Sequence, residues 1–159
     1  MFGIDPNNMA LYIDLAIAFL TLAGVIVAVI GIFRGVHTYK NQMNAQLFLE
    51  FTKRFEEVME SFPEDAWPSR LNINAEPPPE SKELSASVLR YLNLCGEEYY
   101  LYLKEWLDEK VWKIWEDELI RTLQTPLFRR EWPKLSSEFE AYLEFKEYVN
   151  DKQKGTRRN

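Results

Sequence analysis

The fold is decided by residues 15–33, which read LAIAFLTLAGVIVAVIGIF. These 19 residues include no charged side chain, no amide and no proline. At 1.5 Å per residue, an α-helix of this length spans about 28 Å, close to the roughly 30 Å hydrocarbon thickness of a bilayer. The alternative, a buried core helix, rarely stays apolar on every face for five turns. The stretch therefore predicts a transmembrane helix that contacts membrane lipids.

The residues on either side of this stretch predict its orientation. Residues 1–14 contain two aspartates and no lysine or arginine, whereas Arg34 and Lys40 follow the apolar run. The positive-inside rule then places the N-terminus outside and residues 34–159 in the cytoplasm. A cleaved signal peptide would need a positive N-terminal region and a shorter apolar run, so we expect the helix to be retained.

The composition excludes several classes of protein. The chain has 159 residues, a net charge of −6, one histidine and one cysteine. A single cysteine forms no intramolecular disulfide, and one cysteine with one histidine cannot make a zinc site, so we expect no metal and no cofactor. A net-acidic chain is also a poor binder of nucleic-acid phosphates, and we expect no nucleic-acid partner.

A stripe of small residues lies on one face of the predicted transmembrane helix. It comprises residues at spacings of four, three and four: Gly24, Ala28, Gly31 and Gly35. Small residues let helix backbones approach closely in lipid, although glycine and alanine are frequent in membrane helices in general. We interpret the stripe as an oligomerisation face, for a second copy or for another membrane protein. Asp14, at the outer end of the run, is expected to be an interfacial residue.

The rest of the chain predicts an all-α fold, because apolar residues recur every three or four positions and no hairpin pattern occurs. We expect the transmembrane helix to continue into a stalk helix, followed by a small cytoplasmic helical domain. The expected segments are a short external N-terminus (1–14), the transmembrane helix (15–33), the stalk helix (34–62), an exposed Pro-rich loop (63–80), the helical domain (81–150) and a basic disordered tail (151–159).

Capping residues place the helices of the cytoplasmic domain. One helix is expected from Ser81 to Trp106, and Asp108 can cap the next. Thr125, followed by a proline, reads as the N-cap of a short helix that ends at Pro133. Ser137 and the glutamate three residues later form a capping-box pair that would start the last helix.

No catalytic constellation is present. His37 has no nucleophile near it in the sequence, and Cys95 falls on an apolar helix stripe, where a free cysteine is usually a small buried hydrophobe. The acidic pair 97–98 and the acidic run 116–118 lack the Glu-x-x-His motifs of di-iron bundles, so we expect them to form a solvated face. The chain is therefore not expected to be an enzyme.

Four arginines form a candidate anion-binding group: Arg90, Arg121, Arg129 and Arg130. Arginine pairs with phosphate through two hydrogen bonds and stacks on aromatic rings. Phe128 and Trp132 lie beside the last two in the sequence. The alternative, salt bridges to the many acidic side chains, is also open, and so is contact of the basic tail with anionic lipid headgroups.

Two stretches carry a resemblance. Residues 39–62 read YKNQMNAQLFLEFTKRFEEVMESF, and residues 90–132 begin RYLNLCGEEYYLYLKEWLDEKVWKIWEDELI. Together with the transmembrane run they resemble small, uncharacterised bacterial single-pass membrane proteins with a cytoplasmic helical domain. The resemblance implies a bacterial inner-membrane location and transfers no activity.

Two functional hypotheses follow from these features. The first is a non-enzymatic membrane protein that mediates assembly, as a homo-oligomer or as an accessory subunit of an inner-membrane complex. The second is a ligand-gated membrane effector, in which the arginines bind an anionic nucleotide signal and the bundle of transmembrane helices rearranges into a leak.

Overall fold

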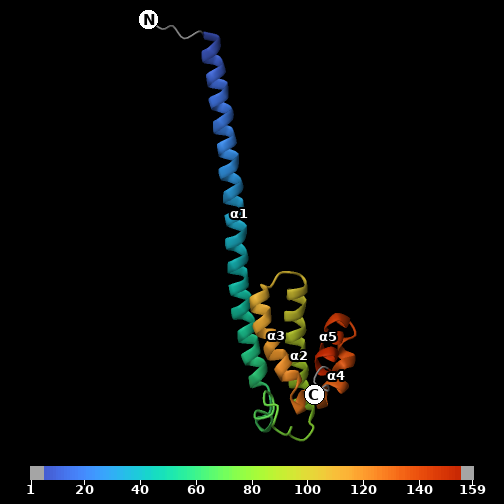
Figure 1. Ribbon diagram of the computed structural model, residues 1–159. Coiled ribbons are helices and arrows are strands. Elements are labelled where there is room, and N and C mark those ends of the chain that lie inside the picture. The colour runs from blue at the N-terminus through green and yellow to red at the C-terminus, as the bar shows by residue number, and fades with distance from the viewer. Residues whose placement is uncertain (1–5, 155–159) are drawn as a thin grey trace. The chain divides into compact units, whose positions relative to one another are not determined.

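A computed structural model describes residues 6–154 of the chain, with the side chains described from residue 9. Within this range the protein is all-α, as predicted (Figure 1). The helices are α1 (Pro6–Glu60), α2 (Lys82–Leu103), α3 (Glu109–Leu123), α4 (Pro126–Leu135) and α5 (Leu143–Lys154). The chain divides into two compact units, one up to Met43 and one from Asn44. Because α1 crosses this boundary, its last part belongs to the second unit.

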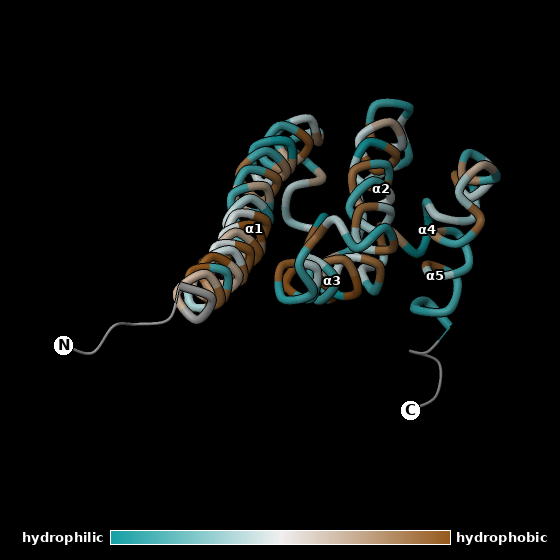
Figure 2. Tube along the Cα trace, turned by 90° about the horizontal axis from the view of Figure 1, so that it is seen from above, coloured by the Kyte–Doolittle hydropathy of each residue, from teal (hydrophilic) through white to brown (hydrophobic). Residues whose placement is uncertain are grey.

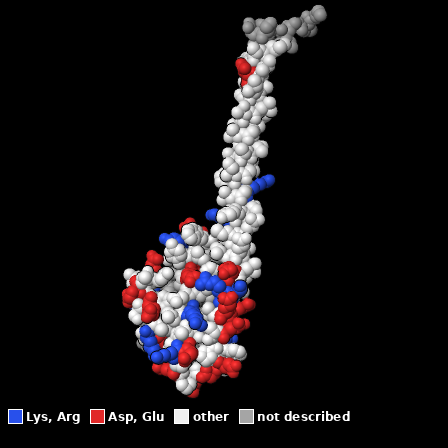
Figure 3. Space-filling view, turned by 180° about the vertical axis from the view of Figure 1, so that it is seen from behind, with Lys and Arg blue, Asp and Glu red and all other residues white. Residues whose placement is uncertain are grey.

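Helix α1 confirms that the apolar run continues into the stalk without a break. The helix begins at Pro6, nine residues before the apolar run, because the fixed φ of proline suits the first helical position. In the first unit, every large apolar side chain from Met9 to Tyr39 is exposed. Figure 3 shows this surface as a long white stretch, while charged residues gather over the second unit. No part of the most apolar window is buried.

Local capping starts the helices of the second unit where the sequence predicts. The Ser81 hydroxyl accepts a hydrogen bond from the Leu84 amide at 3.0 Å. The Asp108 carboxylate accepts one from the Lys110 amide at 2.9 Å. Thr125 caps α4, with proline at the first helical position. Each cap satisfies an amide that the first turn of a helix leaves free.

Helices α2 and α4 end at other residues than the sequence predicts. Helix α2 ends at Leu103, because Glu105 takes a left-handed conformation with φ of 57° and turns the chain. Helix α4 continues through Pro133 to Leu135, although the proline has no amide hydrogen and removes one backbone hydrogen bond near the helix end.

The last helix starts later than the expected capping box. Residues 136–139 form a 3-10 turn, and α5 begins at Leu143. Phe139 is 2% exposed and packs against Trp132 and Phe145, at ring-centroid distances of 5.5 and 5.6 Å. Burial of this ring bends the chain before the helix can begin. Helix α5 then extends to Lys154, so residues 151–154 are helical rather than part of a disordered tail; the remaining tail lies outside the described residues.

The helical domain starts earlier than expected, at Asn44 rather than at residue 81. Phe51, Met59 and Phe62 are buried, and the last two belong to the hydrophobic core built by α2 to α5. Figure 2 shows hydrophobic and hydrophilic residues alternating around α2 and α3, as expected for helices with one buried face. The end of the stalk is therefore one helix of the domain.

The Pro-rich segment, residues 63–80, is a largely exposed loop, as predicted, but two of its residues are anchored in the domain. Ala66 and Ser69 are buried, and residues 64–66 form a 3-10 turn. The Trp67 indole donates a hydrogen bond to the Phe62 carbonyl at 2.9 Å, and Arg70 donates to the Met59 carbonyl at 2.5 Å. These bonds are made to carbonyls at and just beyond the last turn of α1, so the segment folds back over the end of the helix.

Candidate functional site

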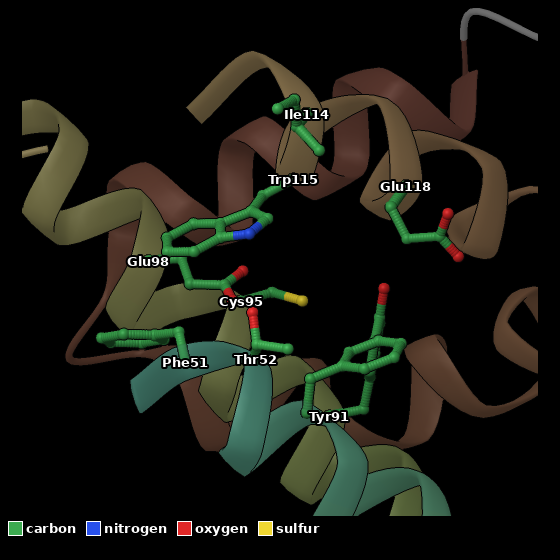
Figure 4. Close-up of a pocket in the computed structure, with 9 residues that line it drawn as sticks. Phe51, Thr52, Tyr91, Cys95, Glu98, Ile114, Trp115 and Glu118 are labelled. Carbon is green, nitrogen blue, oxygen red and sulfur yellow. The ribbon is translucent and has the colours of Figure 1, made fainter. Parts of the chain in front are cut away.

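A cavity of about 200 Å³ lies among three helices of the second unit (Figure 4). Three residues from each of α1, α2 and α3 line it: Phe51, Thr52, Phe55, Tyr91, Cys95, Glu98, Ile114, Trp115 and Glu118. Helical spacing brings each set of three to one face of its helix, since side chains three or four positions apart are neighbours.

Aromatic rings build the walls of the cavity. The Trp115 and Phe51 rings lie 5.4 Å apart between centroids, and the Phe48 ring stacks on Trp115 at 6.1 Å. On the other side, Tyr91 packs against Phe55 at 6.3 Å and against the buried Phe128 at 5.1 Å. Because each ring has a second ring behind or beside it, the walls are fixed by packing.

Glu98 places a carboxyl group in this apolar setting. Its side chain is 6% exposed and makes no hydrogen bond or ion pair with any residue in the described range. Burial raises the pKa of Glu98 to about 8, with Arg54 acting in the opposite direction and Glu97 adding to the rise. The group is therefore mostly neutral at pH 7 and ionises under mildly alkaline conditions.

Cys95 and Tyr91 also line the cavity and stay protonated. Burial raises the pKa of the Cys95 thiol well above its ordinary value, and the nearby Glu98 adds to this. Burial likewise raises the pKa of Tyr91. A thiol held in its neutral form is a weak nucleophile, so Cys95 behaves here as the small buried hydrophobe that the sequence predicts.

Two acidic side chains next to Glu98 are paired. Arg54 donates two hydrogen bonds to the Glu97 carboxylate, at 2.6 and 3.0 Å. Glu118 forms an ion pair with Arg121, one turn along α3. Of Glu97, Glu98 and Glu118, Glu98 is thus the one without a counter-charge in contact with it.

A second buried glutamate, Glu131, has the opposite environment. It is 0% exposed, and its carboxylate accepts hydrogen bonds from the Ser85 hydroxyl at 2.8 Å and from the Arg130 guanidinium at 2.8 Å. Lys134 lies 3.4 Å away. Arg130 also donates to the Pro78 carbonyl at 2.6 Å, so this network ties α4 to α2 and to the Pro-rich segment.

The predicted oligomerisation residues lie on an uncovered face. A methyl group added at Gly24, Gly31 or Gly35 would meet no atom within 4 Å, and Ala28 is exposed. The face therefore has room for the backbone of another helix. Nothing in the described part of the chain occupies it.

The four arginines of the candidate anion site have separate surroundings. Arg121 pairs with Glu118 on its own helix, and Arg130 pairs with Glu131 on α4. Arg90 is exposed on α2. Arg129 lines a different hollow of about 330 Å³, together with Trp132 and Lys154 among others. A pocket shared by all four would have to break two ion pairs.

Sequence reasoning missed Glu98. We expected the acidic pair 97–98 to form a solvated face, and this is wrong for Glu98, which is buried. The signal was present, because Glu98 continues an apolar series at spacings of four and three: Leu84, Val88, Tyr91, Cys95 and Glu98. Among the described histidine, cysteine and acidic residues, no group of three is placed to hold a metal ion.

The described residues form an all-α protein with one N-terminal helix that is long and apolar enough to cross a membrane. No family model, curated protein or solved structure matches the chain.

Proposed function

We propose that this chain is a non-enzymatic, single-pass membrane protein of the bacterial inner membrane that mediates assembly. It acts as a homo-oligomer or as an accessory subunit of a membrane complex. The single observation that supports the proposal most strongly is the fully exposed apolar window of α1, which also carries an open face of small residues. Exposed apolar surface of this extent in water would drive aggregation, and lipid or another helix covers it in a bilayer.

The orientation belongs to the same proposal. Arg34 and Lys40 follow the apolar run and no basic residue precedes it, which favours a cytoplasmic second unit. The packed core and paired surface charges of that unit are typical of a water-exposed domain.

The test of assembly is the mass of the full-length protein in a non-ionic detergent, measured by light scattering. We expect a discrete oligomer for the wild type and a monomer for Gly31→Leu, because a leucine on the stripe keeps helix backbones apart. Two alanine-to-leucine variants provide a matched pair. Ala28→Leu lies on the stripe and should dissociate the oligomer, whereas Ala23→Leu lies about 100° away from Gly24 and should not. A wild-type monomer, or equal effects of both alanine variants, would refute self-assembly through this face.

We also propose an alternative, a membrane effector gated by an anionic nucleotide. The observation that favours it is the hollow lined by Arg129, Lys154 and Trp132, which offers two cations and an indole ring. Isothermal calorimetry with nucleotides, and membrane depolarisation on overexpression, test this alternative. Loss of nucleotide binding in Arg129→Gln would support it, and the absence of any binding together with normal membrane potential would refute it.

A further inference from the structure

We propose that the cavity among α1, α2 and α3 binds a small organic ammonium ion, with Glu98 as its counter-ion and the Phe51 and Trp115 rings as its walls. This inference does not depend on the proposed function. It rests on the geometry of a site that the assembly proposal leaves unused.

Glu98 offers a carboxyl group without a partner at the wall of the cavity. The residue is 6% exposed, and its side chain forms no hydrogen bond or ion pair with another residue in the described part of the chain. Its oxygens are not among the fully enclosed unpartnered atoms, so the carboxyl group is reached from solvent through the cavity. Figure 4 shows it pointing into the cavity beside Cys95 and Trp115. A bound cation would supply the missing partner.

The charges around the cavity favour a cation over an anion. The charged or titratable groups around the Glu98 carboxyl are Arg54 with Glu50 on α1, Tyr91, Cys95 and Glu97 on α2, and Glu118 with Arg121 on α3. Arg54 is held by Glu97, and Arg121 by Glu118. Glu98 is therefore the lining carboxyl group that a bound cation could pair with, whereas a bound anion would meet two carboxyl groups, those of Glu98 and Glu118.

An organic ammonium ion fits the cavity better than a metal ion does. A divalent metal needs several oxygen or nitrogen ligands around one point, and no three histidine, cysteine or acidic side chains in the described range are placed to provide them. Aromatic faces attract organic ammonium ions, most strongly where water is excluded. The cavity presents both a carboxyl group and aromatic faces.

The size of the cavity limits what can bind in it. A volume of about 200 Å³ lies below the roughly 300–1,000 Å³ of pockets for drug-sized ligands, which limits the occupant to a molecule with few heavy atoms. Tetramethylammonium, choline and butylammonium fit this description. Butylammonium has three N–H donors, whereas tetramethylammonium and choline have none, so the comparison shows whether a hydrogen bond to Glu98 or ring contact dominates.

The test compares choline with its neutral isostere 3,3-dimethyl-1-butanol, which has the same shape and no charge. Binding is measured by isothermal calorimetry on the full-length protein in a maltoside detergent, which carries no ammonium group. We expect one site per chain and a preference for choline of about tenfold or more. The affinity should rise between pH 6 and pH 9, because the cation binds to the ionised form of Glu98.

Two variants make the test specific. Glu98→Gln keeps the shape of the side chain and should abolish the preference for choline. Asp117→Asn removes one negative charge from the exposed residue beside Glu118 and should leave the preference unchanged. Circular dichroism shows whether each variant is folded. If Glu98→Gln does not fold, Trp115→Leu replaces it, and we expect the preference to fall with the loss of a ring wall.

Three results would overturn the proposal. They are equal binding of choline and its isostere by the wild type, a choline preference that survives in Glu98→Gln, and no saturable binding of any of the three ammonium ions. Equal binding would identify a simple apolar pocket.

Discussion

From Met9 to Tyr39 the large apolar side chains of α1 are all exposed, whereas Phe51, Met59 and the apolar residues of α2 to α5 form a buried core. The two sets belong to different units, yet α1 contributes to both. A continuous helix therefore does not reveal which medium its side chains meet. The distribution of charge does, since no ionised side chain occurs between Asp14 and Arg34 while acidic and basic residues cover the second unit.

The largest effect should come from breaking the buried network of the second unit. Glu131→Ala leaves Arg130 without its carboxylate partner, and we expect a loss of about 3–5 kcal/mol in the free energy of unfolding. Urea unfolding of the full-length protein in detergent, followed by tryptophan fluorescence, measures this loss. The control is Glu138→Ala, in the 3-10 turn after α4. Equal stability of the two variants would contradict the structural role of Glu131.

A leucine-to-alanine substitution in each unit tests the difference between the exposed helix and the buried core. Leu92 is 0% exposed and Leu20 is 68% exposed. Leu92→Ala should destabilise the second unit by about 2–5 kcal/mol, because it leaves a cavity in the core. Leu20→Ala should leave the unfolding of the second unit unchanged within about 0.5 kcal/mol. A similar loss in both variants would mean that the exposed helix is packed against protein.

Glu98 predicts a pH dependence with a definite sign. The carboxyl group ionises near its ordinary value of 4.5 in the unfolded chain and near 8 in the folded one. Between these values the folded state holds a proton that the unfolded state has lost, so stability falls as the pH rises, by up to about 1.4 kcal/mol per pH unit.

Glu98→Gln should remove this slope and be more stable than the wild type at pH 8. Thermal unfolding from pH 5 to pH 9 measures the slope in both proteins. Parallel curves for the wild type and Glu98→Gln would contradict the burial of an ionisable group at this position.

The smallest effect concerns the turn between α2 and α3. Glu105 has a φ of 57°, a conformation that costs an L-residue with a side chain roughly 1–2 kcal/mol relative to glycine. Glu105→Gly should raise the free energy of unfolding by up to about 1 kcal/mol, since the more flexible unfolded chain offsets part of the gain. A destabilised variant in urea unfolding would show that the side chain makes a compensating contact.

Local signals predicted the helices well. Ser81, Asp108 and Thr125 start α2, α3 and α4 as expected, because a cap depends on the next three residues of the chain. The burial of Phe139, and of Ala66 and Ser69 within the otherwise exposed Pro-rich loop, was not predictable in this way, since it depends on packing against other parts of the chain.

The candidate site, too, was only partly predictable from local sequence signals. Cys95 was predicted to be buried from its helical spacing. Glu98 follows the same spacing, but we expected it to face solvent because carboxylates generally do, and it is buried. The arginines could be named from the sequence, while their pairing with Glu118 and Glu131 required the fold.

The measurement that tests the central claim most directly is the labelling of single introduced cysteines in bacterial spheroplasts. A membrane-impermeant maleimide is added to cells that express Asn7→Cys or Lys113→Cys, and the wild type controls for the buried Cys95. If residues 15–33 cross the membrane with the second unit in the cytoplasm, Asn7→Cys is labelled in intact spheroplasts and Lys113→Cys only after permeabilisation. Labelling of both positions from outside, or of Lys113→Cys alone, would contradict this account.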